Sequence, residues 1–363
     1  MLKSLAITNF TVFPRANLRF GKNLNVIVGE NGSGKTHILK IAYSGIAASA
    51  KLAREQSVSG ATGKAQWQMT LAAKLKGVFR PDGLWRLVRR TRGRSKCELI
   101  FSFNETKLNL QFGFSSVARQ EVTLKKVPAA CVDKLPVYLP TRELLTLYPG
   151  FVSLYDTTDL SFEETWRDTC ILLGAPLARG ARDQRIAQVL DPLEVAMGGK
   201  VELDKAGPGR FYLNLSSGNM EVHLVAEGLR KLATVARLVA TGSLLDKGYL
   251  FWDEPESNLN PKIIKVVAGT ILQIARSGIQ VFVATHSLFL LRELHILQQG
   301  PFAMLDSQYF GLHLGEDGAV SVTQGPTVDD VGSIAALDED LQQSERYIDT
   351  ELGVPVNAGS DRE

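Results

Sequence analysis

The sequence contains few cysteines and no long apolar run. Its 363 residues include three cysteines, Cys97, Cys131 and Cys170. They are odd in number and too far apart for a C-x-x-C metal knuckle, which argues against a disulfide framework and against a cysteine zinc site. No apolar stretch approaches the roughly 20 residues that a membrane-spanning helix needs, and the first ten residues lack the pattern of a signal peptide. We therefore expect a cytoplasmic protein with reduced thiols.

A large excess of charge of one sign is also missing. The chain has 41 Lys and Arg residues against 38 Asp and Glu residues, and this net charge of +3 by itself indicates no particular partner. The distribution is less even, because acidic residues dominate from Pro326 onward, where hydrophobic residues are few. We expect residues 313–363 to form an acidic C-terminal tail outside the core.

Apolar runs of strand length alternate with segments of helical periodicity. The strand-like runs are residues 24–28, 137–140, 249–252 and 279–284, and the helical segments are residues 227–241 and 261–276. Buried strands that alternate with helices predict an α/β fold with a mostly parallel core sheet. Its two parts would come from residues 1–140 and 225–312.

Other segments do not follow this pattern. Residues 53–64 are predicted to form a loop, and period-2 patterns from about 65 to 125 predict an inserted antiparallel β subdomain. Helical spacing from 144 to 198, followed by two short strands of which the second is 221–224, makes 141–224 a predicted helical lobe with a hairpin.

The clearest motif is a phosphate-binding loop. The segment Gly29-Glu-Asn-Gly-Ser-Gly-Lys-Thr36 matches G-x-x-x-x-G-K-[ST], with an apolar strand before it and a predicted helix after it. Its glycines allow backbone N–H groups to surround an anion, Lys35 would reach the β- and γ-phosphates, and Thr36 would ligate Mg²⁺. The residues expected around the phosphates are Gly29, Asn31, Gly32, Ser33, Gly34, Lys35, Thr36 and His37.

An acidic pair follows the apolar strand 249–252. Asp253 would hold the Mg²⁺ and its waters, and Glu254 would deprotonate the attacking water. His286, at the end of the next strand, would contact the γ-phosphate. Phe13 precedes the phosphate loop and could stack on adenine, although a phenylalanine is more often a core residue. Since no N-K-x-D element selects guanine, these residues favour ATP.

These motifs resemble the ABC-type ATPases of the SMC, RecF and OLD (overcoming-lysogenization-defect) group. The resemblance covers roughly residues 1–50 and 137–312. The motifs that carry it are Thr8-Asn-Phe10, the phosphate loop, Asp253-Glu-Pro-Glu-Ser-Asn-Leu-Asn260 and Ala284-Thr-His286. It implies an ABC-type P-loop ATPase that acts as a head-to-tail dimer. The small AAA-type ATPases of bacterial phage-defence and retron operons, such as the Septu ATPase, look most similar. In them the ATPase works beside a separate nuclease, and the chain after residue 312 is too short for the Toprim domain of OLD proteins.

The signature helix of that family has two candidates here. Leu215-Ser-Ser-Gly-Asn219 is nearer to L-S-G-G-Q in letters, but Ala226-Glu227-Gly228 opens a long predicted helix and is favoured. Its backbone N–H groups would meet the γ-phosphate held by the other subunit. The family's Q-loop glutamine has no counterpart, so that Arg142 or Glu143 would have to serve.

A basic stretch of the sequence could contact more than one kind of partner. It consists of Arg80, Arg86, Arg89, Arg90, Arg92, Arg94 and Lys96. The segment Arg86–Lys96 could contact a nucleic-acid backbone, or it could be a solvated hairpin that docks an acidic protein.

Taken together, the motifs and the resemblance predict an ATP- and Mg²⁺-dependent ATPase that controls a partner effector, such as a nuclease or toxin, in phage defence. The alternative is a DNA-binding RecF- or SMC-like repair or genome-maintenance ATPase.

Overall fold

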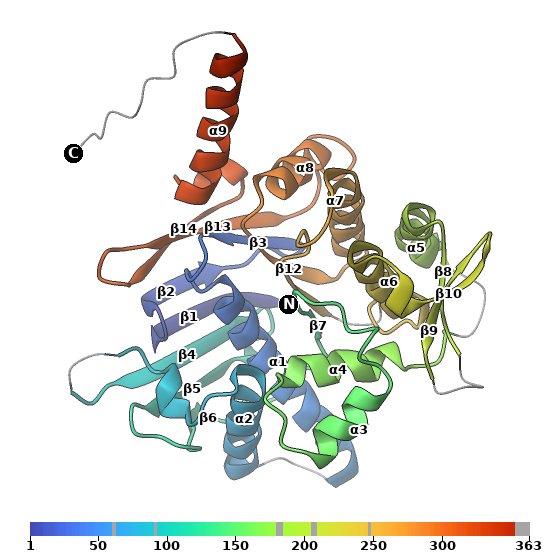
Figure 1. The fold of residues 1–363 in the computed structure, drawn as a ribbon. Coiled ribbons are helices and arrows are strands. Elements are labelled where there is room, and N and C mark those ends of the chain that lie inside the picture. The colour runs from blue at the N-terminus through green and yellow to red at the C-terminus, as the bar shows by residue number, and fades with distance from the viewer. Residues whose placement is uncertain (60–62, 91–92, 179–183, 205–208, 246–247, 353–363) are drawn as a thin grey trace.

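The computed structural model describes residues 1–59, 63–90, 93–178, 184–204, 209–245 and 248–352. Its core is a six-stranded sheet in the order β14-β13-β3-β12-β11-β7 (Figure 1). The strands are β14 Val320–Gly325, β13 Ser307–Leu314, β3 Leu24–Gly29, β12 Gln280–Thr285, β11 Tyr249–Asp253 and β7 Val137–Leu139. All neighbours are parallel except β13 and β14, which confirms the predicted mostly parallel sheet.

The central strands are apolar because elements cover both of their faces. Every residue of β3, β11 and β12 is buried. On one face lie α6 (Glu227–Ala240), α7 (Pro261–Arg276) and α8 (Leu288–Gln298), and on the other lies α1 (Lys35–Ser59) (Figure 1). A strand that is covered on both sides leaves no polar face, which explains the continuous apolar runs of the sequence.

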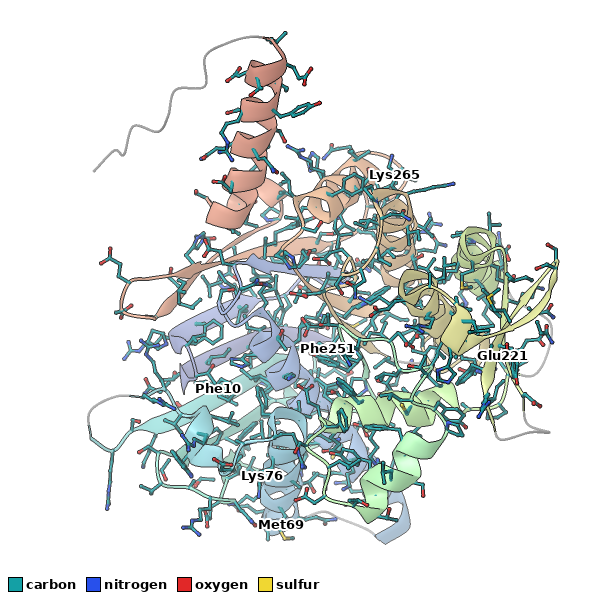
Figure 2. The ribbon with its side chains drawn as sticks, viewed as in Figure 1. Phe10, Met69, Lys76, Glu221, Phe251 and Lys265 are labelled. Atoms are coloured by element: carbon teal, nitrogen blue, oxygen red, sulfur yellow. The ribbon has the colours of Figure 1, made fainter. Side chains whose placement is uncertain are left out.

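A second, antiparallel sheet lies beyond α1. Its order is β2-β1-β4-β5-β6. The strands are β1 Leu2–Phe10, β2 Phe13–Arg19, β4 Lys96–Phe103, β5 Leu110–Ser115 and β6 Thr123–Lys126. Because β1 pairs with both β2 and β4, the predicted β subdomain is not a separate unit but extends the N-terminal hairpin. Side chains fill the space between the sheets, with Phe10 and Phe251 inside and Lys265 at the periphery (Figure 2).

Two predictions for the segment between the phosphate loop and β4 are wrong. Residues 53–59 continue α1, so they are not a loop, and Lys64–Phe79 forms the helix α2 where strands were expected. Helix α2 buries Trp67, Leu71 and Leu75, which lie four residues apart. This spacing is helical, and the period-2 interpretation of residues 65–79 missed it.

The predicted helical lobe is present and is joined to α1 and α2 by polar contacts. It contains α3 (Gly150–Thr157), α4 (Glu164–Leu173) and α5 (Gln184–Met197), with the small sheet β10-β9-β8 beside them. The strands of that sheet are β8 Gly199–Leu203, β9 Phe211–Leu215 and β10 Gly218–Glu221; residues 222–224 form a 3-10 turn, which corrects the strand predicted for 221–224. The buried Tyr43 hydroxyl of α1 donates to Asp168 at 2.5 Å, and Lys74 of α2 pairs with Asp168 and Glu164.

The C-terminal part differs from the prediction. Strands β13 and β14 belong to the core sheet, so the folded core continues to Gly325, beyond residue 312. The acidic segment that follows includes the helix α9 (Ala335–Glu351), which leads away from the body of the molecule (Figure 1). None of the described helices is long and apolar enough to cross a membrane.

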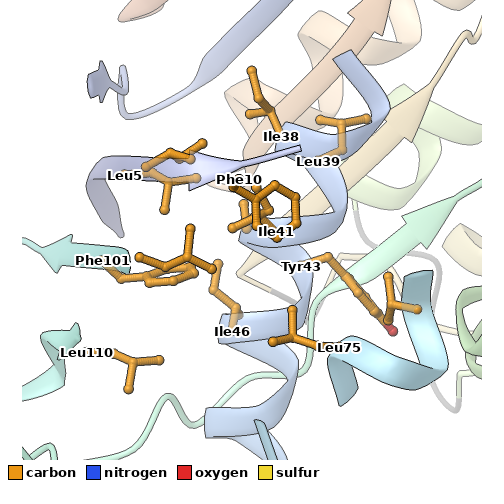
Figure 3. Packing of buried hydrophobic residues seen from close by; sticks show 14 of the residues in the cluster. Leu5, Phe10, Ile38, Leu39, Ile41, Tyr43, Ile46, Leu75, Phe101 and Leu110 are labelled. Carbon is orange, nitrogen blue, oxygen red and sulfur yellow. The ribbon is translucent and has the colours of Figure 1, made fainter. Parts of the chain in front are cut away.

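Helix α1 is held against the antiparallel sheet at a position where only glycine fits. Phe101 lies against α1 (Figure 3), and a Cβ on Gly45 would lie 2.5 Å from its ring. A Cβ on Gly269 in α7, by contrast, would meet no atom within 4 Å. We expect Gly45→Ala to lower the free energy of unfolding by about 1–2 kcal/mol, since overpacking outweighs the gain in helix propensity.

The control is Gly269→Ala, which should raise the free energy of unfolding by about 0.5–1 kcal/mol because the helix gains alanine without a clash. Urea titration followed by circular dichroism measures both. Stabilisation by both substitutions would contradict the packing assigned to Gly45.

Candidate active site

The phosphate loop connects the end of β3 to the start of α1. Gly32 and Gly34 have φ angles of +84° and +90°, in the left-handed region that favours glycine. A Cβ on Gly34 would also lie 2.8 Å from both Phe13 and Val12. The loop therefore requires glycine here for its backbone conformation and for its packing.

Lys35 is folded into the loop that precedes it. Its Nζ donates to the carbonyl oxygens of Gly29 at 2.8 Å and Glu30 at 3.0 Å. Burial lowers the pKa of this lysine, while the nearby carboxylates, Glu254 first among them, oppose the effect. A buried ammonium group with only two carbonyl partners retains a third N–H for an anion.

The other predicted loop residues differ in their roles. Ser33 is buried and its hydroxyl donates to the Glu30 carbonyl at 2.8 Å, whereas Asn31 and Gly32 are exposed at the tip of the loop. The ring of His37 lies 3.0 Å from the Thr11 hydroxyl, on the side of the core. Burial, helped by the charge of Lys40, lowers the pKa of His37 to about 4. Its side chain is therefore neutral and engaged away from the loop, which corrects its assignment to the phosphates.

The predicted stacking of Phe13 on adenine is also corrected. Phe13 is 0% exposed and packs directly beneath Gly34. Its ring supports the phosphate loop from below and presents no free face to a base, so the core alternative was the right one.

The structure brings Asp253 to the start of α1. The Thr36 hydroxyl donates to both carboxylate oxygens of Asp253, at 2.9 and 3.1 Å, and the buried Tyr138 hydroxyl lies 3.3 Å away. Burial raises the pKa of Asp253 to about 6, although the hydrogen bond from Thr36 opposes the shift. A hydroxyl and a carboxylate held together in this way are oxygen ligands of the type that Mg²⁺ prefers.

Glu254 and His286 form the second part of the site. Nδ1 of His286 lies 3.2 Å from Oε1 of Glu254, and this hydrogen bond lowers the pKa of the glutamate and raises that of the histidine. Glu254 has a φ of +45°, which is uncommon for a residue with a side chain and is found mainly at functional sites. Its N–H is bound by the Ala284 carbonyl at 2.9 Å, so β12 fixes the turn.

One residue of the site was missed by the sequence reasoning. Glu256 is 6% exposed, and its Oε1 accepts hydrogen bonds from the Thr285 hydroxyl at 2.6 Å and from the N–H of His286 at 3.3 Å. A third acid, only two residues after the acidic pair in Asp253-Glu-Pro-Glu256, was the available signal.

The favoured signature segment lies against the turn that follows Glu254. Ala226 is an exposed N-cap of α6 without a side-chain cap. Gly228 is buried, and a Cβ there would lie 2.9 Å from Leu259. Glu227 accepts from the Asn258 side chain at 3.0 Å, and Lys231 donates to the Ser257 carbonyl at 2.7 Å.

The two remaining motifs of this region occupy different positions. The rival segment Leu215–Asn219 forms the turn between β9 and β10 in the small sheet. Of the two Q-loop candidates, Arg142 is exposed, whereas Glu143 is buried and pairs with Arg230 of α6 at 3.1 Å. Glu143 therefore links the segment after β7 to α6.

The basic stretch is only partly available to a ligand. Arg80 pairs with Asp159 and Arg86 with Asp82, and Arg89 donates to the carbonyl oxygens of Val12 and Gly318. Arg90, Arg94 and Lys96 are exposed, and Arg92 lies outside the described residues. A contact with a large partner would therefore depend on the second half of the stretch.

The residues present fit a nucleotide with Mg²⁺. Glycines line the loop where side chains would collide, and a buried ammonium and a hydroxyl–carboxylate pair meet beside it. In the part of the chain that the structure describes, no three His, Cys, Asp or Glu side chains group as a metal site.

Two protein-family models match parts of this chain. Residues 134–292 match an AAA-domain family whose description names the AbiEii toxin of a type IV toxin–antitoxin system, and residues 4–41 match a second AAA-domain family. Among curated proteins, none matches the sequence.

Solved structures share the fold. The SmcHead bound to the C-winged helix domain of ScpA has 13% identity and a TM-score of 0.56 over 90% of this chain and 98% of that one. The Smc head domain with an extended coiled coil, bound to the C-terminal domain of ScpA and derived from Pyrococcus furiosus, has 11% identity and a TM-score of 0.53 over 96% and 99%. At these identities the likeness concerns the fold alone.

Proposed function

We propose that this chain, an ABC-type P-loop ATPase of the SMC kind, binds ATP with Mg²⁺ and hydrolyses it. The observation that carries the proposal is the meeting of four side chains from three separate segments, Thr36, Asp253, Glu254 and His286, beside a glycine-rich loop. A structural turn would not need a buried carboxylate, a strained glutamate and a paired histidine at one sheet edge.

Each residue has a chemical role in this proposal. Lys35 and the N–H groups of the loop bind the β- and γ-phosphates, and Thr36 and Asp253 hold Mg²⁺, which supplies charge neutralisation at the phosphates. Glu254 takes the proton of the attacking water. His286 contacts the γ-phosphate and sets the state of Glu254 through their hydrogen bond.

Turnover should depend on Glu254 and binding on Lys35. We expect Glu254→Gln to keep ATP affinity while lowering kcat by roughly 10²–10⁴-fold, the usual contribution of a general base. Lys35→Ala should weaken ATP binding, because the charge that faces the phosphates is lost. Phosphate release and titration with a fluorescent ATP analogue measure the two effects.

Glu105→Gln is the matched control, because Glu105 is an exposed glutamate that pairs with Lys107 at the surface. It should leave both quantities unchanged. Hydrolysis near the wild-type rate in both site variants would show that the site is wrongly assigned.

ATP binding would act by closing two copies head to tail. The exposed, uncapped N-terminus of α6 at Ala226 offers N–H groups to a phosphate held by a second copy. Contacts of Lys231 and Glu227 join this helix to the turn after Glu254, and Glu143 joins it to the segment after β7. Closure and catalysis would therefore be coupled.

We propose that closure controls a separate effector, a nuclease or toxin, in bacterial phage defence. The toxin named in the matched family and the partner-bound SMC heads support a role that involves a partner.

A negative charge at the start of α6 should prevent this closure. Gly228 is a poor probe, because a side chain there would collide with Leu259 of its own chain. We expect Ala226→Glu, in the Glu254→Gln background, to abolish ATP-induced dimers by repelling the phosphate while leaving ATP affinity within about twofold of the parent. Light scattering with and without ATP measures the dimer.

Asn219→Glu adds the same charge to the rival segment, at an exposed position of β10. If this control loses the dimer and Ala226→Glu retains it, the signature segment is Leu215–Asn219.

A second candidate function is DNA-dependent repair or genome maintenance. The observation that favours it is the exposed group Arg90, Arg94 and Lys96, for which the described residues provide no ion pair, on a chain with the fold of an SMC head. We rank it second because Arg80, Arg86 and Arg89 are engaged within the protein.

The salt dependence of DNA binding separates the two functions. If the three exposed residues contact phosphates, their joint replacement by Ala should flatten the slope of log affinity against log salt by about 0.9 for each contact. The triple variant of Lys262, Lys265 and Arg292, which are exposed on α7 and α8, is the control of equal charge. Filter binding with duplex DNA measures the slopes for the wild type and the two triple variants. Equal slopes in all three proteins would show that this stretch does not contact nucleic acid.

A further inference from the structure

The side chain of His286 lies between two carboxylates. Its Nδ1 is 3.2 Å from Oε1 of Glu254 and 3.8 Å from Oε1 of Glu256. Because an ionised carboxylate only accepts hydrogen bonds, Nδ1 must carry the proton. Lys35 is the nearby cation that opposes a charge on the imidazole, and the two glutamates favour it.

The contact with Glu254 competes with its proposed role as a general base. The Nδ1–H group that donates to Oε1 of Glu254 occupies part of the acceptor capacity of this carboxylate. The water to be activated needs the same carboxylate. If the Nδ1–H group donates to another acceptor, both oxygens of Glu254 are free for the water.

Glu256 provides a second acceptor in a fixed position. Its Oε1 is anchored by the Thr285 hydroxyl at 2.6 Å and by the backbone N–H of His286 itself at 3.3 Å, and the side chain is 6% exposed. Its Oε2 receives no hydrogen bond from the described part of the chain. A buried carboxylate with unused acceptor capacity is stabilised by an additional donor.

We propose that Glu256 is a positioning residue that accepts the Nδ1–H of His286 and thereby releases the carboxylate of Glu254 for catalysis. The movement is short, since the Nδ1–Oε1 distance of 3.8 Å is within one ångström of a hydrogen bond. The proton stays on Nδ1 throughout, and no bond other than hydrogen bonds changes. This inference rests on the proposed ATPase function, and the tests below distinguish a failure of that function from a failure of the role proposed for Glu256.

The first test needs neither turnover nor a change at Glu256. In the Glu254→Gln variant without nucleotide, Nδ1 has Glu256 as its remaining anionic acceptor, so the pKa of His286 should stay above the ordinary value of about 6.5. Titration of the imidazole signals by NMR measures it, and His286→Ala identifies the signal among the five histidines. A pKa of His286 at or below the ordinary value in this variant overturns the proposal.

The second test is a double-mutant cycle on hydrolysis. Glu256→Gln keeps an amide oxygen for Thr285 and for the backbone of His286 but loses the charge, so we expect kcat to fall about tenfold with KM unchanged, the size of one hydrogen bond to a charged group. In the His286→Ala background the same substitution should change kcat less than about twofold, because Glu256 acts through the histidine.

Each alternative gives a different result. Equal losses of kcat in both backgrounds mean that Glu256 serves only the structure, and an unchanged kcat in Glu256→Gln also overturns the proposal. If the wild-type protein shows no hydrolysis that Glu254→Gln abolishes, the proposed function fails, and the NMR titration alone decides whether Glu256 holds the histidine.

Discussion

The hydrogen bonds between the Thr36 hydroxyl and the Asp253 carboxylate connect two halves of the chain that are 217 residues apart. One partner lies in the first turn of α1, and the other ends β11, a strand whose residues are all buried. This contact places the phosphate loop before Thr36 relative to the turn after Asp253. Since parallel strands end at the same edge, the sheet delivers both segments to one site.

The turn that follows Asp253 contacts several other elements of the site. Glu254 meets His286, Glu256 holds the end of β12, and Ser257 and Asn258 bind the first turns of α6. The unusual backbone of Glu254, with its positive φ, is kept because neighbouring strands and helices fix both sides of it.

The helical lobe is tied to this site through polar contacts, and its helices also share a packed apolar core with α6 and the sheet. Glu143 pairs with Arg230, and Lys74, Tyr43 and Asp168 join α4 to α1 and α2. Such contacts have defined geometry and can exchange partners, whereas the packed apolar core resists gradual deformation.

The sequence alone determined the parts of the protein that depend on local order. The phosphate loop, the acidic pair and the buried strands are recognised from adjacent residues, because backbone conformation and strand burial impose residue types at fixed spacing. The pairing of Arg89 with Val12 and Gly318, the burial of Phe13 and the position of Glu256 beside His286 join residues that are distant in sequence. No local pattern records such neighbours. Only the tertiary structure decided that Phe13 supports the loop, that α2 replaces predicted strands, and that β13 and β14 complete the core sheet, because these outcomes follow from which surfaces meet after the chain has folded.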